Sequence, residues 1–141
     1  MTIQSYGKEL TANDTGETGA HQAGIHIPKS QKELLAFLPP LDAAVKNPEA
    51  WLEMRDDAGE VWRFRYIHYN NSLHDPGGTR DEFRITHMTA FFRAAGAVAG
   101  DTVILSGEPG SWRYTIAVRK PGVADDGEPA APVRVLSLIH I

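Results

Sequence analysis

An alternating row of charged residues, TRDEFRIT at positions 79–86, carries the most distinctive chemistry in this sequence. On an extended backbone alternate side chains share one face, so Arg80, Glu82 and Arg84 are predicted to project to the same side. In the DNA major groove arginine donates two hydrogen bonds to guanine, and a carboxylate accepts one from cytosine. The row therefore has the groups needed to read G·C base pairs. On the pattern alone, an exposed strand with weak ion pairs is the more common explanation.

A second polar stretch, KELTANDTGETGAHQAG, begins at Lys8 and could bind the same kind of ligand. Lys8 could neutralise a phosphate, and backbone N–H groups around Thr15 and Gly16 could donate hydrogen bonds to phosphate oxygens. The side chains that could reach base edges are Asn13, Asp14, His21 and Gln22. From composition alone, an ordinary polar loop is the simpler interpretation.

The motifs of common enzyme classes are absent from the sequence. None of the six histidines forms an HExxH pair, and there is no GxSxG elbow, GxxxxGK[ST] loop or GxGxxG turn. Asp75, Asp81 and Glu82 could bind a metal ion in a small nuclease, but no lysine stands near them to position an attacking water. We therefore expect no catalytic residue, metal or cofactor in this chain. A small metal-dependent nuclease that uses His21 or these three carboxylates stays open as an alternative.

The composition is that of a single soluble globular domain. The chain has 141 residues, of which 42% are hydrophobic and 23% are charged. That length is enough to bury about two thirds of the unfolded surface. Neither a membrane span nor a secretory signal is evident, and the absence of cysteine fits a reducing compartment. We expect a cytoplasmic protein without a membrane partner.

The charge is unevenly distributed along the chain. The formal net charge is −4, which argues against indiscriminate binding to nucleic acid. However, residues 61–123 contain eight Lys/Arg and five Asp/Glu, and all but one of these cations are arginine. Arginine is the residue suited to bidentate recognition. An acidic protein can thus carry a locally basic middle segment.

Alternating hydrophobic patterns predict several strands, and these elements must position the charged stretches. GIHIP predicts a short strand, residues 50–69 a hairpin around DDAG, and residues 101–120 a second hairpin around EPGS. In the first hairpin Trp62, Phe64 and Tyr66 should face the core, with Arg63 and Arg65 on the opposite face. Residues 70–85 are predicted to be a loop that leads into a short strand.

Two short helices are predicted between these strands. SQKELLAFL has Ser30 three residues before Glu33, which is typical of a capping box. THMTAFFRAAG predicts a helix capped by Thr86 at its start and Gly96 at its end. Residues 1–22 show neither helical nor strand periodicity and are expected to form a long loop. The result is a mostly β architecture with two short α-helices, for which we expect a barrel.

The end of the chain differs from the rest. Residues 121–132 are a Pro/Gly-rich connector, and residues 133–141 predict a terminal strand or the truncated start of a continuation. A third functional interpretation is a non-catalytic β-barrel that binds a ligand or protein through Trp62, Trp112 and Tyr114. These aromatic residues alternate as core residues do, which favours packing.

The two polar stretches together resemble a known family. ANDTGETGAHQAGIHIP is similar to a motif of the N-terminal effector-binding domain of EcoRII-type restriction endonucleases, and YNNSLHDPGGTRDEFRIT resembles the family's second segment. WRFRYIHYNNS, the following helix and AGDTVIL also resemble the DNA-binding pseudobarrel of plant auxin-response-type transcription factors. The similarity covers roughly residues 8–120 and favours a binding function for both stretches.

The resemblance implies a seven-stranded DNA-binding pseudobarrel that grips duplex DNA with two arms in the major groove. The arms would be residues 8–22 and 69–84. The residues that match family positions implicated in DNA contact are Lys8, His21, Arg80, Glu82 and Arg84. Further candidates on the two segments are His26, Asn70, Asn71 and Asp81. Glu9, His26 and Gly78 stand where the family is expected to have arginine, tyrosine and lysine. Losing two cations should weaken phosphate attraction.

The resemblance also implies a biological setting. The chain would be a single DNA-recognition domain over residues 1–141 without its own catalysis, acting as the effector or targeting domain of a bacterial restriction endonuclease. Its expected target is a CCWGG-like site with flanking G·C pairs. The expected partners are double-stranded DNA and a covalently attached C-terminal nuclease domain, and only that domain would need Mg²⁺.

Overall fold

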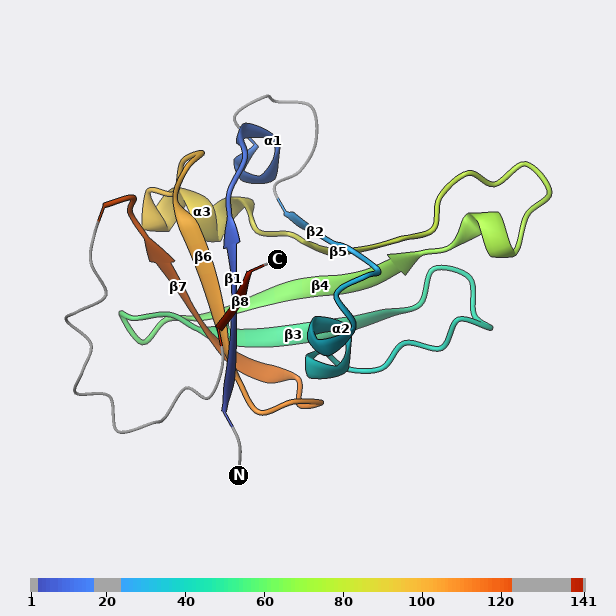
Figure 1. The fold of residues 1–141 in the computed structure, drawn as a ribbon, viewed down its shortest axis with the longest axis horizontal. Helices are drawn as coiled ribbons and strands as arrows, with labels where there is room; N and C mark the ends of the chain where they lie inside the picture. The colour runs from blue at the N-terminus through green and yellow to red at the C-terminus, as the bar shows by residue number, and fades with distance from the viewer. Residues whose placement is uncertain (1–2, 17–23, 123–137, 141) are drawn as a thin grey trace.

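A computed structural model of the chain describes residues 3–16, 24–122 and 138–140, the last three by backbone alone. Eight strands in this part of the chain form one strongly curled sheet, accompanied by three short α-helices and a 3-10 turn (Figure 1). The strands are β1 (Gln4–Glu9), β2 (Ile25–Ile27), β3 (Glu49–Arg55), β4 (Val61–Tyr69), β5 (Glu82–Thr86), β6 (Thr102–Gly107), β7 (Arg113–Arg119) and β8 (Leu138–His140). The helices are α1 (Ala12–Thr15), α2 (Lys32–Phe37) and α3 (Thr89–Ala95), and the 3-10 turn η1 is Asn71–Leu73.

The sheet order is β2-β5-β4-β3-β7-β6-β1-β8. Neighbouring strands are antiparallel except for the pairs β3–β7 and β1–β8, which are parallel. The predicted mostly β pseudobarrel is confirmed by strands β1 to β7. β8 adds a short eighth strand within the predicted terminal-strand segment, and the described residues contain three short α-helices where two were predicted.

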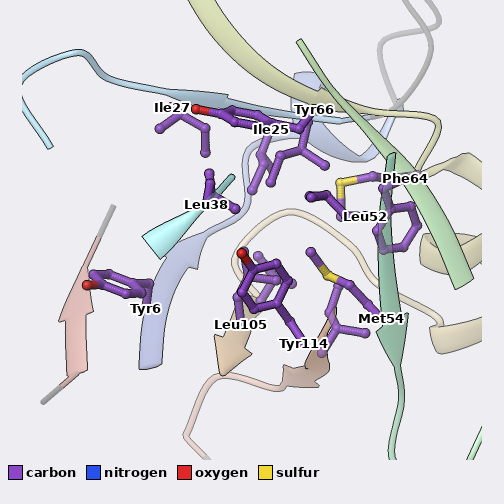
Figure 2. Close-up of a cluster of buried hydrophobic side chains, with 14 of the residues drawn as sticks. Tyr6, Ile25, Ile27, Leu38, Leu52, Met54, Phe64, Tyr66, Leu105 and Tyr114 are labelled. Carbon is purple, nitrogen blue, oxygen red and sulfur yellow. The ribbon is translucent and has the colours of Figure 1, made fainter. Parts of the chain in front are cut away.

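The hydrophobic core lies inside the curled sheet, where side chains from opposite strands meet (Figure 2). In β4 the predicted alternation is confirmed, because Phe64 and Tyr66 are buried while Arg63 is exposed. Phe37 of α2 closes one end of the core between the rings of Tyr6 and Tyr114, with ring centroids 4.7 and 4.6 Å away. Burial of such aromatic side chains is a main source of the fold's stability.

The prediction that residues 1–22 form a long loop was wrong for the described part of that segment. Gln4–Glu9 form β1, which pairs along its whole length with β6, and Ala12–Thr15 form α1. The period-two pattern was hidden because Gly7 has no side chain and Lys8 points to a partner inside the molecule. Pairing with β6 stabilises β1, and the capping box of Thr11 and Asp14 stabilises α1, so neither element depends on a hydrophobic pattern that the sequence would show.

The two predicted helices exist, but both predicted N-caps were wrong. α2 begins after Gln31 without a side-chain cap, and the Ser30 carbonyl accepts from the Lys32 N–H. Thr86 is the last residue of β5, so α3 begins after Met88. The predicted end of α3 is confirmed, since Gly96 adopts the left-handed conformation with φ of 65°.

The aromatic residues of the third interpretation do not form one surface. Tyr114 is 5% exposed and belongs to the core. Trp62 packs edge-on against Phe91, and its indole N–H donates to Asp56. Trp112 was predicted to alternate with the core residues of β7, but it precedes the strand and is 49% exposed. Within the described residues, no helix is long and apolar enough to cross a membrane.

Candidate functional site

The predicted Arg-Glu-Arg row lines one cleft. Arg80, Glu82 and Arg84 project to the same side, as the strand period requires, although Arg80 lies just before β5. The cleft has a volume of about 490 Å³. Its lining residues come from α1, β4, β5 and the loops beside them: Asn13, Arg65, Tyr69, Arg80, Glu82, Arg84, Thr86 and His87.

Glu82 holds the two arginines of this cleft in place. Its Oε2 accepts from Arg80 at 2.9 Å and from Arg84 at 3.3 Å. The Arg80 guanidinium also lies over the Tyr69 ring, 3.9 Å from the centroid. Burial opposes ionisation of Glu82, but the hydrogen bonds and charges of the two arginines outweigh burial and lower its pKa. The carboxylate is therefore ionised at neutral pH and fixes both guanidinium groups.

The backbone around Arg80 is also fixed. The Asn71 side-chain oxygen accepts from the Arg80 N–H at 2.7 Å, and the Arg80 carbonyl accepts from the Ser72 N–H at 3.0 Å. Gly78 passes so close to Asn71 that a Cβ atom there would lie 2.1 Å from the Asn71 carbonyl oxygen. A side chain at position 78, such as the lysine expected there, would therefore not fit this loop conformation unless the loop shifted.

Asn70 braces the same loop from beneath. It is fully buried, exchanges two hydrogen bonds with Asn47, and donates from its side chain to the carbonyl of Val45 at 2.9 Å. Asn70, predicted as a DNA contact, thus has a structural position that joins residues 43–47 to the β4–β5 loop. Figure 1 shows this loop extending from the end of β4.

The nuclease hypothesis used either His21, which falls outside the described residues, or three carboxylates. Each of the three carboxylates has a cationic partner. Asp75 pairs with Lys46 at 2.6 Å, and Asp81 pairs with Lys29 at 2.9 Å. The expectation that no lysine stands near these carboxylates was therefore wrong, because folding brings Lys46 and Lys29 beside two of them. No group of three potential metal ligands occurs among the described residues. In the described part of the chain, each of these carboxylates is thus engaged by a cationic side chain.

Asp81 lies on the opposite side from Glu82 because they are neighbours on an extended backbone. His68 contacts Asp81 Oδ1 through Nε2 at 2.7 Å, and the imidazole stacks on Phe83 with centroids 4.0 Å apart. The hydrogen bonds from His68 and then Lys29 lower the pKa of Asp81 below its usual range. This residue anchors the root of β5 and points away from the cleft's Arg-Glu-Arg row.

The first predicted arm contains a buried ion pair. Lys8 Nζ lies 2.6 Å from Asp14 Oδ2, and these side chains are only 14% and 6% exposed. Asp14 also accepts from the Thr11 N–H, while the Thr11 hydroxyl accepts from the Asp14 N–H, so the two form a capping box. These contacts position α1, from which Asn13 reaches the cleft.

Other candidates of the first arm are distributed differently. The Thr15 hydroxyl donates to the Ala12 carbonyl. His26 is exposed on β2 and lies opposite Arg84 in the β2–β5 register. His21 and Gln22 fall outside the described residues, and their predicted contacts stay predictions.

Four residues of the cleft were missed by the sequence reasoning: Arg65, Tyr69, Thr86 and His87. Arg65 was assigned to the polar face of β4, but its position beside Thr86 depends on the β4–β5 register. His87 has φ of 68°, which is uncommon for a residue other than glycine. Because His87 was assigned to the first turn of the helix predicted after Thr86, the sequence reasoning did not predict this bend.

Comparison with known families identifies related domains. The family described as "Restriction endonuclease EcoRII, N-terminal" matches residues 1–99. Type II restriction enzyme EcoRII from Escherichia coli is 40% identical over 93 residues, which cover 62% of this chain and 22% of that enzyme. Auxin response factor 2 from Oryza sativa subsp. japonica is 32% identical over 123 residues, covering 86% of this chain and 15% of that protein. The chain therefore spans a small part of these relatives.

Solved structures also share this architecture. The Arabidopsis FUS3-DNA complex matches with a TM-score of 0.59 and 26% sequence identity, covering 81% of this chain and 94% of that chain. A hypothetical Arabidopsis thaliana protein matches with a TM-score of 0.57 and 10% identity, covering 86% of this chain and 95% of that chain. The second likeness concerns the fold alone, whereas the first is to a protein solved on DNA.

Proposed function

The chain belongs to the family of EcoRII N-terminal domains, and on that premise we propose that it binds double-stranded DNA through the cleft between α1 and β5. The observation that carries the proposal is the convergence of two segments far apart in the sequence. Asn13 from the first arm lines the same cleft as Arg80, Glu82 and Arg84 from the second. Family membership and the likeness to a solved DNA complex support this ligand.

The chemistry of the cleft supports sequence-specific recognition in the major groove. Each guanidinium carries five N–H donors, and a single carboxylate oxygen of Glu82 engages one group on each arginine. Arg80 and Arg84 therefore keep donors for guanine O6 and N7, and Glu82 keeps an acceptor for cytosine N4. Because these groups suit G·C pairs, a CCWGG-like target is proposed, with both arms entering the groove.

Within a longer protein, the domain would act as the effector or targeting part of a bacterial restriction endonuclease. The relation to EcoRII supports this role. The proposed partners are DNA and an attached C-terminal nuclease domain, in the cytoplasm. The chain itself is proposed to bind without cofactor or catalysis, since Asp75, Asp81 and Glu82 are each engaged by cations. Mg²⁺ would serve only the nuclease domain.

Substitution of Arg80 tests the proposed base readout. Selection from randomised duplexes first defines the preferred site, and affinity is then measured for that site and for random DNA. Arg80→Ala is expected to cost about 1 to 3 kcal/mol more on the selected site than on random DNA. Arg93→Ala is the matched control, because Arg93 is an exposed arginine on α3 and does not line the cleft.

Two results would contradict the proposal in different ways. Equal losses on both DNAs would remove Arg80 from base readout and leave it a phosphate contact. A wild-type chain that shows no DNA binding, even at low salt where phosphate attraction is strongest, would refute the function itself. Incubation with plasmid and Mg²⁺ tests the nuclease alternative, and cleavage by the purified chain would support that alternative.

A further inference from the structure

A second group of cationic and aromatic side chains adjoins the cleft on the outer face of β3 and β4. Trp51 of β3 is 40% exposed. The Arg63 guanidinium lies over this ring, 5.9 Å from its centroid, and the His87 ring meets it edge-on with centroids 5.2 Å apart. We call Trp51, Arg63 and His87 the tryptophan patch.

The strand register connects the tryptophan patch to the cleft. Thr86 lies opposite Arg65 in the β4–β5 pair, and Arg65 lies opposite Trp51 in the β3–β4 pair. These three residues therefore form a row across the sheet, and His87 belongs to both the patch and the cleft lining. Adjacent strands are about 4.8 Å apart, so Trp51 lies about 10 Å from the Thr86 end of the row.

That distance selects the part of DNA that the patch can meet. The major groove is about 12 Å wide. When the side chains of the cleft contact bases inside the groove, side chains about 10 Å to one side of the cleft lie beside the sugar–phosphate strand that borders the groove. The tryptophan patch is thus placed for contacts with the backbone outside the bases read by Arg80, Glu82 and Arg84.

The charge of Arg63 fits the same ligand, because other arginines engage the carboxylates on the same face of β3. Glu49 is paired with Arg65 at 2.5 Å, and Glu53, which lies opposite Arg63, is paired with Arg113 at 3.6 Å. In the described part of the chain, Arg63 has no carboxylate within ion-pair distance, and its side chain lies at the surface beside Trp51. An arginine held over an aromatic ring keeps its charge and its donors in a defined place. An exposed indole offers an apolar face to a deoxyribose.

Building on the proposed DNA-binding function, we propose that Trp51, Arg63 and His87 bind the sugar–phosphate backbone of DNA that flanks the recognised bases. Arg63 donates to a phosphate, Trp51 packs against deoxyribose, and His87 orients the Trp51 ring. Contacts of this kind increase affinity without adding base discrimination. The patch extends the footprint from the cleft toward β3.

Two duplexes with the same selected site test this extension. One ends at the edges of the site, and the other continues by about one helical turn, roughly 10 base pairs, on each side. Arg63→Ala is expected to weaken binding to the longer duplex about threefold at moderate salt and to reduce the salt slope by about 0.9, as loss of one phosphate contact requires. Binding to the shorter duplex should not change.

Arg93→Ala is the control for this experiment as well. Arg93 is an exposed arginine on α3, and it lies outside the cleft and outside the tryptophan patch. The control should bind both duplexes as the wild type does. Trp51→Phe should keep most of the affinity for the longer duplex and Trp51→Ser should lose it, with thermal melting to show that each variant is folded.

Three outcomes would overturn the tryptophan patch as a DNA surface. These are equal losses for Arg63→Ala on both duplexes, an unchanged affinity for the longer one, or an equal effect of Arg93→Ala. In all three cases the wild type still binds the selected site, so the proposed function stands. A wild type that binds neither duplex refutes the proposed function and the patch together, which separates the two failures.

Discussion

The two arms contain similar charged side chains in opposite environments. In the first arm Lys8 and Asp14 form a single ion pair that is 14% and 6% exposed. In the second arm Glu82 is shared by Arg80 and Arg84, with exposed fractions of 29%, 44% and 24%. The first pair has little access to a ligand, whereas the second group lines an open cleft.

This difference shows how one residue type can serve structure or recognition. A buried pair compensates its own desolvation only while both partners are present, so Asp14 and Lys8 stabilise the position of α1. An exposed pair contributes little to stability. Glu82 instead orders two guanidinium groups and leaves most of their donors available. Residue type and spacing do not distinguish the structural ion pair from the group proposed for recognition, whereas the burial of their side chains does.

Asp14→Asn should have the largest effect on stability. The substitution removes the charge partner of the largely buried Lys8 and weakens the capping box with Thr11. The free energy of unfolding should fall by about 3 kcal/mol, measured by urea denaturation. The ratio of affinities for selected and random DNA should stay the same. A specific loss of discrimination in the folded variant would show that Asp14 contacts bases after all.

Gly78→Ala should have the next largest effect and should act on the second arm. A Cβ at this position would lie 2.1 Å from the Asn71 carbonyl oxygen, so the loop must shift. We expect a loss of about 1 to 3 kcal/mol in unfolding free energy and weaker DNA binding, because Asn71 also holds the Arg80 backbone. Both quantities are measured on the same preparation.

Gly77→Ala is the matched control, since a Cβ there meets no atom within 4 Å. This variant should keep the stability and affinity of the wild type. If both alanine variants behaved alike, the close approach of Gly78 to Asn71 would not be what shapes the loop.

Sequence reasoning predicted local patterns well and long-range positions poorly. The alternation in β4 and the shared face of Arg80, Glu82 and Arg84 follow from a period of two, and both are present. The role of Asn70 could not be predicted, because its partners are Asn47 and Val45, more than twenty positions earlier. Such contacts depend on the tertiary arrangement. The resemblance to a family supplied the topology that local patterns could not.

Glu82→Gln should separate recognition from stability. The free energy of unfolding should change by less than about 1 kcal/mol, because the ion pairs of Glu82 are partly exposed. Discrimination of the selected site should fall by about 1 kcal/mol, since the carboxylate acceptor for cytosine is lost. Affinity for random DNA should rise, because one negative charge leaves the cleft. A fall in affinity on both DNAs would mean that Glu82 acts only by ordering the arginines.

The smallest expected effect concerns acid stability at the root of the first arm. The Asp101 carbonyl accepts a hydrogen bond at 2.7 Å from the N–H of Leu10, the residue that connects β1 to α1. Burial raises the pKa of Asp101, but hydrogen bonds from Lys120 and the Val98 N–H, with the charge of Lys120, outweigh it and lower the pKa overall. A carboxyl whose pKa is lower in the folded state stabilises the fold above its unfolded pKa.

That stabilisation should be present above the usual aspartate pKa of about 3.9 and should be lost as the pH falls through the lower folded value. Asp101→Asn should therefore reduce the unfolding free energy at neutral pH by about 1 kcal/mol, because Lys120 is half exposed. It should also flatten the decline of that free energy between about pH 5 and pH 2. Urea denaturation across this range measures both. If the unfolding free energy of the variant fell with acid as steeply as that of the wild type, another carboxyl would be responsible. Asp81 at the root of the second arm would then be the next residue to replace, because His68 and Lys29 lower its pKa.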